Sequence, residues 1–225
     1  TLNKLILINM ENKQDLPLVE FVLKTDEGDD LEVVSIVKDP AIEKSFQLFK
    51  AVELFNKSNK ELFKAKTDKQ EITGPVMIPD LKILRYNEEK KEYFNCWFSA
   101  ETVKECAALY LKNCNHTKAN FDHLDNYSNN VYVIESWIVE DPENDKSKAL
   151  GFTDVVPGTW FMTYKVDSPE LWKTIKANGF TGFSIEGWFS QFANHKERLL
   201  YSVINSNLND TDKESLIKKI INTAS

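Results

Sequence analysis

Gly182-Phe183-Ser184-Ile185-Glu186-Gly187 sets a serine among strand-forming neighbours and places a glycine at each end. Aromatic and β-branched residues favour a strand, and glycine within a strand lets another backbone or a ligand come close. We therefore predict a strand from Phe180 to Phe189, with space cleared around Ser184. Serine becomes a nucleophile only when a base removes its proton, and histidine titrates in the range suited to that task. His123 is the candidate base.

Composition narrows the class of protein. The 225 residues suffice for one domain with a sizeable core, and 42% hydrophobic with 28% charged residues is ordinary for a globular protein. The net charge of −7 argues against a nucleic-acid partner, because phosphate binding needs a basic face. We find no apolar run long enough to span a bilayer and predict no membrane partner. The odd number of cysteines, three, argues against a disulfide scaffold and favours a reducing compartment.

The N-terminal part contains two predicted strands. Residues 18–23 form a β-rich run, and residues 32–37 follow the turn signal at residues 26–30. Pro40 ends the second strand, because proline cannot continue a ladder. We interpret residues 41–66 as a connection that holds a helix or a hairpin.

The core is expected to begin at Glu71, where a glycine and two prolines mark tight bends between short strands. Charged residues 87–91 indicate a hairpin tip, and the chain returns as a strand over residues 93–98. Ser99 is a favourable N-cap for the helix that follows.

The second half alternates strands with helices. Strands are predicted over residues 131–139 and from Gly158 to Val166. Ser168-Pro169 starts a helix that Asn178-Gly179 ends. Residues 211–214 read as a capping box for a final amphipathic helix. The sequence thus predicts an α+β fold with N- and C-terminal arms. We divide it into an N-terminal segment with strands and a connecting arm (1–70), a core (71–190) and a C-terminal helical segment (191–225).

Each candidate residue also has a plain structural explanation. Ser184 lacks the strand-turn-helix setting of a Gly-x-Ser-x-Gly nucleophile elbow, so by itself it reads as a small residue in a crowded strand. His123 reads as a solvated loop histidine, and this applies more strongly to His116 and His195.

Metal chemistry is also poorly supported by the pattern. Cys106, Cys114, His116 and His123 fit no standard zinc spacing, and Cys106 falls on the apolar stripe of its helix. A metal-dependent nuclease built from Asp122, His123 and Asp125 is a third alternative, but the pattern of these residues is not specific for it and the acidic surface disfavours it. We predict no metal and no cofactor.

Glu135 is the most unusual carboxylate. Strict alternation places it on one face with apolar neighbours: Val131, Val133, Trp137 and Val139. A carboxylate on such a face either has a partner or titrates abnormally, although an edge strand could let it reach solvent.

Several blocks together resemble tailed-phage prohead (capsid maturation) proteases of the PBSX-prophage type. They are residues 72–79, the helix after Ser99, and residues 133–142, 158–160, 170–176 and 181–187, in that order. The resemblance covers about residues 71–189. That family is similar in fold to the herpesvirus assemblins, which implies a small closed β-barrel surrounded by helices.

The resemblance also implies the site residues. Ser184 is expected as the nucleophile of a serine endopeptidase and His123 as its general base. Assemblins use a second histidine as third member, whereas an acid is expected in phage relatives. Glu135 is our choice for that acid, because it lies in a matching block.

One strand further extends the resemblance. Residues 33–41 resemble the Glu-Val-Ser…Pro-Ala strand that follows the serine in other prohead proteases, although here it comes first, as in a circular permutation. Val33 stands at the glutamate position, and Glu32 points to the opposite side of the strand.

The expected function is processing of scaffold and capsid proteins during prohead maturation, with autoprocessing. The expected partners are the phage scaffold and the major capsid protein as substrates, with a possible homo-oligomer. The expected location is the host cytoplasm, inside the assembling prohead. The alternative is a catalytically weak or inactive head-assembly scaffold protein of the same fold.

Overall fold

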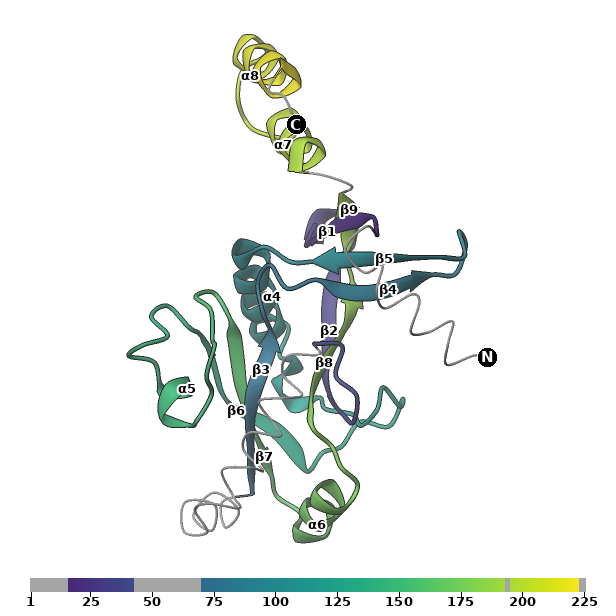
Figure 1. Ribbon diagram of the computed structural model, residues 1–225, viewed down its shortest axis with the longest axis vertical. Helices are drawn as coiled ribbons and strands as arrows, with labels where there is room; N and C mark the ends of the chain where they lie inside the picture. Colours follow the sequence, from purple (N-terminus) through teal and green to yellow (C-terminus); the bar gives the residue numbers. More distant parts are fainter. Residues whose placement is uncertain (1–15, 43–69, 193–194, 223–225) are drawn as a thin grey trace.

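The computed structural model describes residues 16–42, 70–192 and 195–222. Within them the fold is α+β, as predicted, with strands arranged in three sheets (Figure 1). The predicted connection over residues 41–66 lies almost wholly outside the described residues.

The two-stranded sheet carries the serine segment. β2 (Asp30–Val37) pairs antiparallel with β8 (Gly182–Trp188), and Ser35 stands directly opposite Ser184. The register shifts between Leu31 and Val33, where β2 contains one residue more than β8. Both predicted strands are confirmed.

A second sheet has the order β3-β7-β6. Its strands are β3 (Glu71–Met77), β7 (Trp160–Val166) and β6 (Val131–Ile138). β7 lies in the middle and is almost entirely buried, which explains its run of large apolar residues. The register of β6 against β7 shifts between Val133 and Glu135, so the alternation of faces along β6 is interrupted there.

The third sheet joins the N-terminal segment to the core. Its order is β4-β5-β1-β9, with β4 (Ile83–Asn87), β5 (Glu92–Trp97), β1 (Leu18–Val22) and β9 (Ser190–Phe192). β1 is parallel to β5 and antiparallel to β9. The strands of residues 16–42 therefore pair with two strands from the other end of the chain, β8 and β9, and β1 pairs with β5 as well.

Helices α4 (Ala100–Lys112) and α6 (Pro169–Ala177) begin where the sequence predicts. Ser99 Oγ accepts from Thr102 N at 3.2 Å, and Ser168 Oγ accepts from Leu171 N at 3.2 Å. The short elements are η1 (Thr25–Glu27), η2 (Asn115–Thr117) and α5 (Lys146–Ala149).

The core centres on aromatic side chains between β7, α4 and the β2–β8 pair. Tyr110, Trp160, Tyr164 and Phe183 are all fully buried. Tyr164 donates a hydrogen bond to Val34 O at 2.8 Å, and its hydroxyl contacts that of Tyr110 at 3.1 Å. These contacts link the β3-β7-β6 sheet to β2 of the β2–β8 pair.

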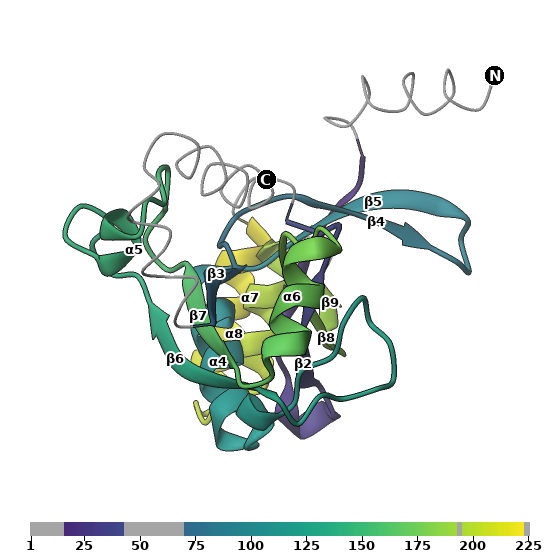
Figure 2. The ribbon, with the colours of Figure 1, turned by 90° about the horizontal axis from the view of Figure 1, so that it is seen from below.

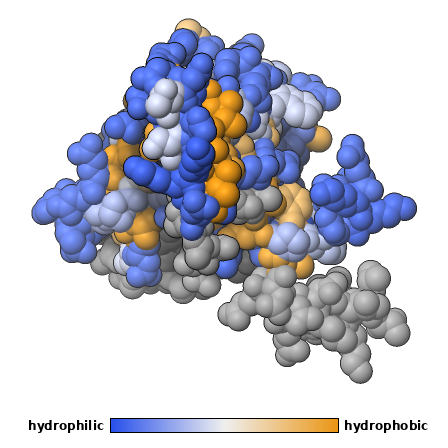
Figure 3. All heavy atoms as spheres, turned by 90° about the horizontal axis from the view of Figure 1, so that it is seen from above, coloured by the Kyte–Doolittle hydropathy of each residue, from blue (hydrophilic) through white to orange (hydrophobic). Residues whose placement is uncertain are grey.

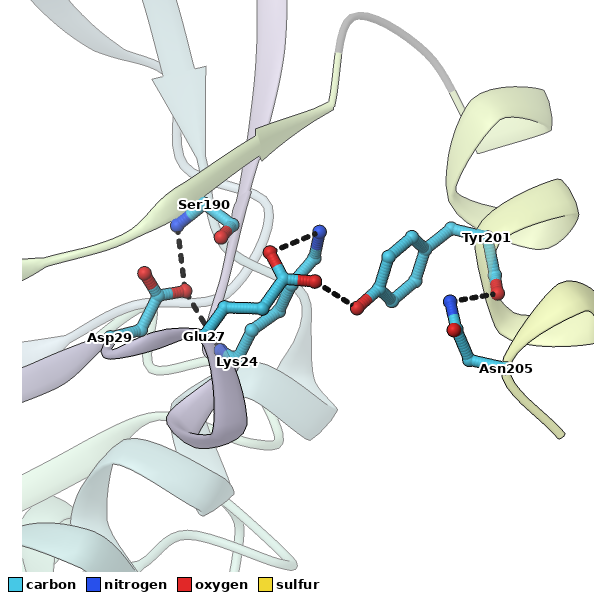
Figure 4. Close-up of polar contacts among 6 residues, drawn as sticks. All are labelled: Lys24, Glu27, Asp29, Ser190, Tyr201 and Asn205. Atoms are coloured by element: carbon cyan, nitrogen blue, oxygen red, sulfur yellow. Dashed lines mark hydrogen bonds and ion pairs between the residues drawn. The ribbon is translucent and has the colours of Figure 1, made fainter.

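The C-terminal helices α7 (His195–Ile204) and α8 (Asp210–Asn222) form a hairpin that projects from the body (Figure 1). Lys24 Nζ lies 3.6 Å from the centre of the Tyr201 ring, and Tyr201 donates a hydrogen bond to Glu27 (Figure 4). Apolar side chains of this end form a stripe between hydrophilic ones (Figure 3). The capping box predicted at residues 211–214 is wrong, because α8 starts earlier and Asn209 Oδ1 accepts from Asp212 N at 3.0 Å.

Two further observations concern the architecture. The ladders do not close into a barrel within the described residues, although β3 packs beside β8. Within the same residues no helix has the length and apolar character needed to cross a membrane.

Candidate active site

The β2–β8 ladder places three polar side chains on one face. Cross-strand partners share a face, and so do residues two apart on one strand. Ser35 and Ser184 are partners, and Glu186 is two residues beyond Ser184. Ser35 is completely buried and Ser184 is 6% exposed.

The loop after η2 brings His123 to this face. It runs beside β2 (Figure 2), and the Ile36 backbone holds it at two points: Ile36 N donates to Asn120 O and Asp122 N donates to Ile36 O, both at 3.0 Å. Asp122 and His123 both have positive φ, +50° and +59°. Such backbone conformations are costly for residues other than glycine and gather at functional sites.

One carboxylate oxygen, Glu186 Oε1, takes part in three polar contacts of the site. Glu186 Oε1 lies 2.9 Å from His123 Nδ1 and accepts from Asn120 Nδ2 at 2.9 Å. Ser35 Oγ also donates to Glu186 Oε1 and lies 3.3 Å from His123 Nδ1. The imidazole is therefore held through Nδ1, which is how an acid orients the histidine of a serine protease.

The hydrogen bonds to Glu186 also affect its ionisation. Burial raises the pKa of this carboxyl, but the hydrogen bonds from Ser35, Asn120 and His123 outweigh burial and leave the pKa below its ordinary value. Glu186 is thus an anion at neutral pH, as an acid that orients a histidine must be.

Ser184 lies on the same face as Glu186. No hydrogen bond joins its hydroxyl to His123, both of these residues being described. Ser184 instead lines a small hollow with mainly apolar walls, which include Val76, Met77, Ile83, Phe98 and Ile185.

The glycines around Ser184 make room for β2 and the residues after it. A Cβ on Gly187 would lie 2.3 Å from Asp30 O, and one on Gly182 would lie 2.7 Å from the ring of Pro40. Gly179 follows α6 with φ +71° and has nothing near. The group that comes close to the glycines of β8 is therefore the backbone and Pro40 of the chain's own N-terminal segment.

Glu135 lies elsewhere. Its side chain is 49% exposed, pairs with Lys146 Nζ at 2.8 Å and accepts from Thr163 Oγ1 at 2.8 Å. The expected apolar face is absent because the shift after Val133 turns Glu135 outward. The hydrogen bonds and ion pair of His123 go to Ser35 and Glu186.

The residues weighed as metal ligands are dispersed. Cys106 is buried in α4, where burial raises the pKa of its thiol to about 12. Asp122 pairs with Lys38 Nζ at 3.0 Å. In the described ranges, no group of three or more histidine, cysteine, aspartate or glutamate residues is arranged to hold a metal ion.

Three residues of this cluster were not identified from the sequence: Ser35, Asn120 and Glu186. Glu186 could have been found, because period-two alternation places it on the face of Ser184. Ser35 and Asn120 depend on pairings between distant segments, which no local pattern encodes.

Comparison with known proteins identifies a matching family. The family model described as "Putative phage serine protease XkdF" matches residues 58–193, more than half of the chain. No curated protein and no solved structure matches significantly.

Proposed function

The chain belongs to the phage serine protease family of XkdF, and on this premise we propose that it is a serine endopeptidase with Ser184 as nucleophile, His123 as general base and Glu186 as orienting acid. The observation that carries the proposal is the 2.9 Å contact between His123 Nδ1 and Glu186 Oε1, on the strand that also bears Ser184. A proton fixed on Nδ1 leaves Nε2 as the acceptor that a serine needs.

The reaction follows from these roles. Ser184 Oγ attacks the peptide carbonyl while His123 Nε2 takes its proton, and the carboxylate of Glu186 stabilises the resulting imidazolium. The imidazolium then protonates the leaving amine, which yields an acyl-enzyme. Water activated by His123 hydrolyses that ester. Ser184 and His123 must come within about 3 Å for the first transfer, and such hydrogen bonds often form only once substrate is bound.

The proposed biological role names the substrates of the protease and the place where it acts. As a phage protease, the protein would cleave scaffold and capsid proteins within the assembling prohead in the host cytoplasm. The hollow beside Ser184 has room for about one water molecule, so a substrate side chain next to the scissile bond would have to widen it on binding. An assemblin-like closed barrel is part of the proposal, supported by the packing of β3 beside β8.

A second candidate is an inactive head-assembly scaffold protein of the same fold. The missing hydrogen bond between Ser184 and His123 favours it, because an inactive protein has no need to keep the two in contact.

The test is active-site labelling of the full chain with a fluorophosphonate, followed by mass spectrometry of the adduct. We expect an adduct on Ser184 and none in Ser184→Ala. Co-production with the phage scaffold and capsid proteins should give cleavage that Ser184→Ala abolishes, a loss of several orders of magnitude. Unchanged cleavage by Ser184→Ala would refute the nucleophile, and a folded protein that neither labels nor cleaves would support the scaffold role.

A further inference from the structure

Ser35 belongs to a strand outside the region that the family model matches, yet its hydroxyl lies within the candidate site. β2 comes before residues 58–193 in the chain. Ser35 is the serine of this strand, and it is completely buried. A buried hydroxyl needs a hydrogen-bond partner, and that of Ser35 is the carboxylate of Glu186.

The position of Ser35 relative to the imidazole separates it from a nucleophile. Ser35 Oγ and Glu186 Oε1 both approach Nδ1 of His123, at 3.3 Å and 2.9 Å. A nucleophilic serine must meet the opposite ring nitrogen, because the acid already occupies the first. Ser35 therefore lies on the acid's side of the ring.

The strand of Ser35 also holds the histidine loop. The Ile36 backbone bonds the loop on both sides of Phe121, and Asn120 turns its amide to the same oxygen of Glu186 that Ser35 binds. β2 thus fixes the histidine through the backbone and the acid through a side chain.

We propose that Ser35 is a positioning residue, which locks the carboxylate of Glu186 against His123 Nδ1 and so keeps the imidazole in the tautomer with Nε2 unprotonated. Its effect on catalysis rests on the proposed function, but its effect on the imidazole does not. Removing one hydrogen-bond donor to a charged carboxylate would lower the rate at which Ser184 reacts by about 10- to 100-fold.

The experiment compares Ser35→Ala, Ser35→Thr and Ser136→Ala in the full chain. Ser136 is a matched strand serine away from the site, whose hydroxyl accepts from Trp160 Nε1 at 2.9 Å. Nitrogen NMR of the imidazoles reports the tautomer of His123, assigned with a His123→Asn variant, and carbon NMR follows the titration of Glu186. Fluorophosphonate labelling reports the reactivity of Ser184, and thermal unfolding checks that each variant is folded.

We expect Ser35→Ala to reduce the Nδ1-protonated tautomer, to move the Glu186 titration to higher pH and to slow labelling. Ser35→Thr, which keeps the hydroxyl, should restore most of each signal, and Ser136→Ala should change none of them. An unchanged tautomer and Glu186 titration in folded Ser35→Ala would overturn the proposal, as would an adduct on Ser35. If the wild-type chain is not labelled, the proposed function fails, and the NMR signals still decide the role of Ser35.

Discussion

Val33 and Glu186 stand directly opposite each other on the β2–β8 ladder. In the Glu-Val-Ser…Pro-Ala strand that residues 33–41 resemble, a glutamate occupies the position of Val33. Cross-strand partners point to the same face, so a carboxylate on either one serves the same space. We infer that Glu186 supplies, from β8, a carboxylate in the space that a glutamate at position 33 would face.

This inference separates two glutamates. Glu186→Gln should lower the rate of Ser184 labelling by about 100- to 10,000-fold, because an amide cannot hold the imidazolium as a carboxylate does. Glu135→Gln should change it by less than about 3-fold, since Glu135 lies on β6 of another sheet and pairs there with Lys146 of α5. Labelling of both variants at one pH measures the difference. A large loss in Glu135→Gln with none in Glu186→Gln would restore Glu135 as the acid.

The ionisation of Glu186 predicts a dependence of stability on acid. The folded-state pKa lies below the ordinary value, so the stabilisation is complete above the unfolded-state pKa and is lost as the pH falls through the folded-state value. The stability difference between the wild type and Glu186→Gln should therefore shrink from about pH 6 to about pH 3. Urea unfolding at several pH values tests this. A difference that stays constant or grows toward acid would contradict the shift.

Gly187 should be needed for the close approach of β2. A Cβ there would meet Asp30 O at 2.3 Å, so Gly187→Ala must displace β2 and should cost about 1–3 kcal/mol. Displacement of β2 also moves Ser35, and labelling of Ser184 should slow. Gly151→Ala is the control, because Gly151 has φ +91° and nothing within 4 Å of its added Cβ. It should lose stability through backbone strain alone and keep its labelling rate. Equal labelling rates in the two variants would argue against a role for β2 in the site.

The sequence predicted the strands and main helices well, because capping serines and β-rich runs are local signals. The predicted face of Glu135 was wrong, because an extra residue in β6 changes the register there. The shift on β6 turns Glu135 outward, and strict alternation could not foresee it. Of the proposed site, the sequence indicated Ser184 and His123, whose roles stay predictions. The contacts of Ser35 and Asn120 with Glu186 join segments that are far apart in the chain, and no local pattern encodes them.

The hydroxyl of Tyr164 should stabilise the packing of the β3-β7-β6 sheet against β2. It donates to Val34 O at 2.8 Å and contacts the Tyr110 hydroxyl at 3.1 Å, with all three groups in the core. Tyr164→Phe leaves these partners buried with one hydrogen bond fewer, which costs about 1–3 kcal/mol of unfolding free energy. Urea unfolding with an unchanged m value measures the loss. The matched control is Tyr132→Phe, whose hydroxyl bonds Asp167 at 3.2 Å at the surface and should cost less than about 0.5 kcal/mol. Equal costs for the two variants would show that the buried network contributes nothing beyond a surface hydrogen bond.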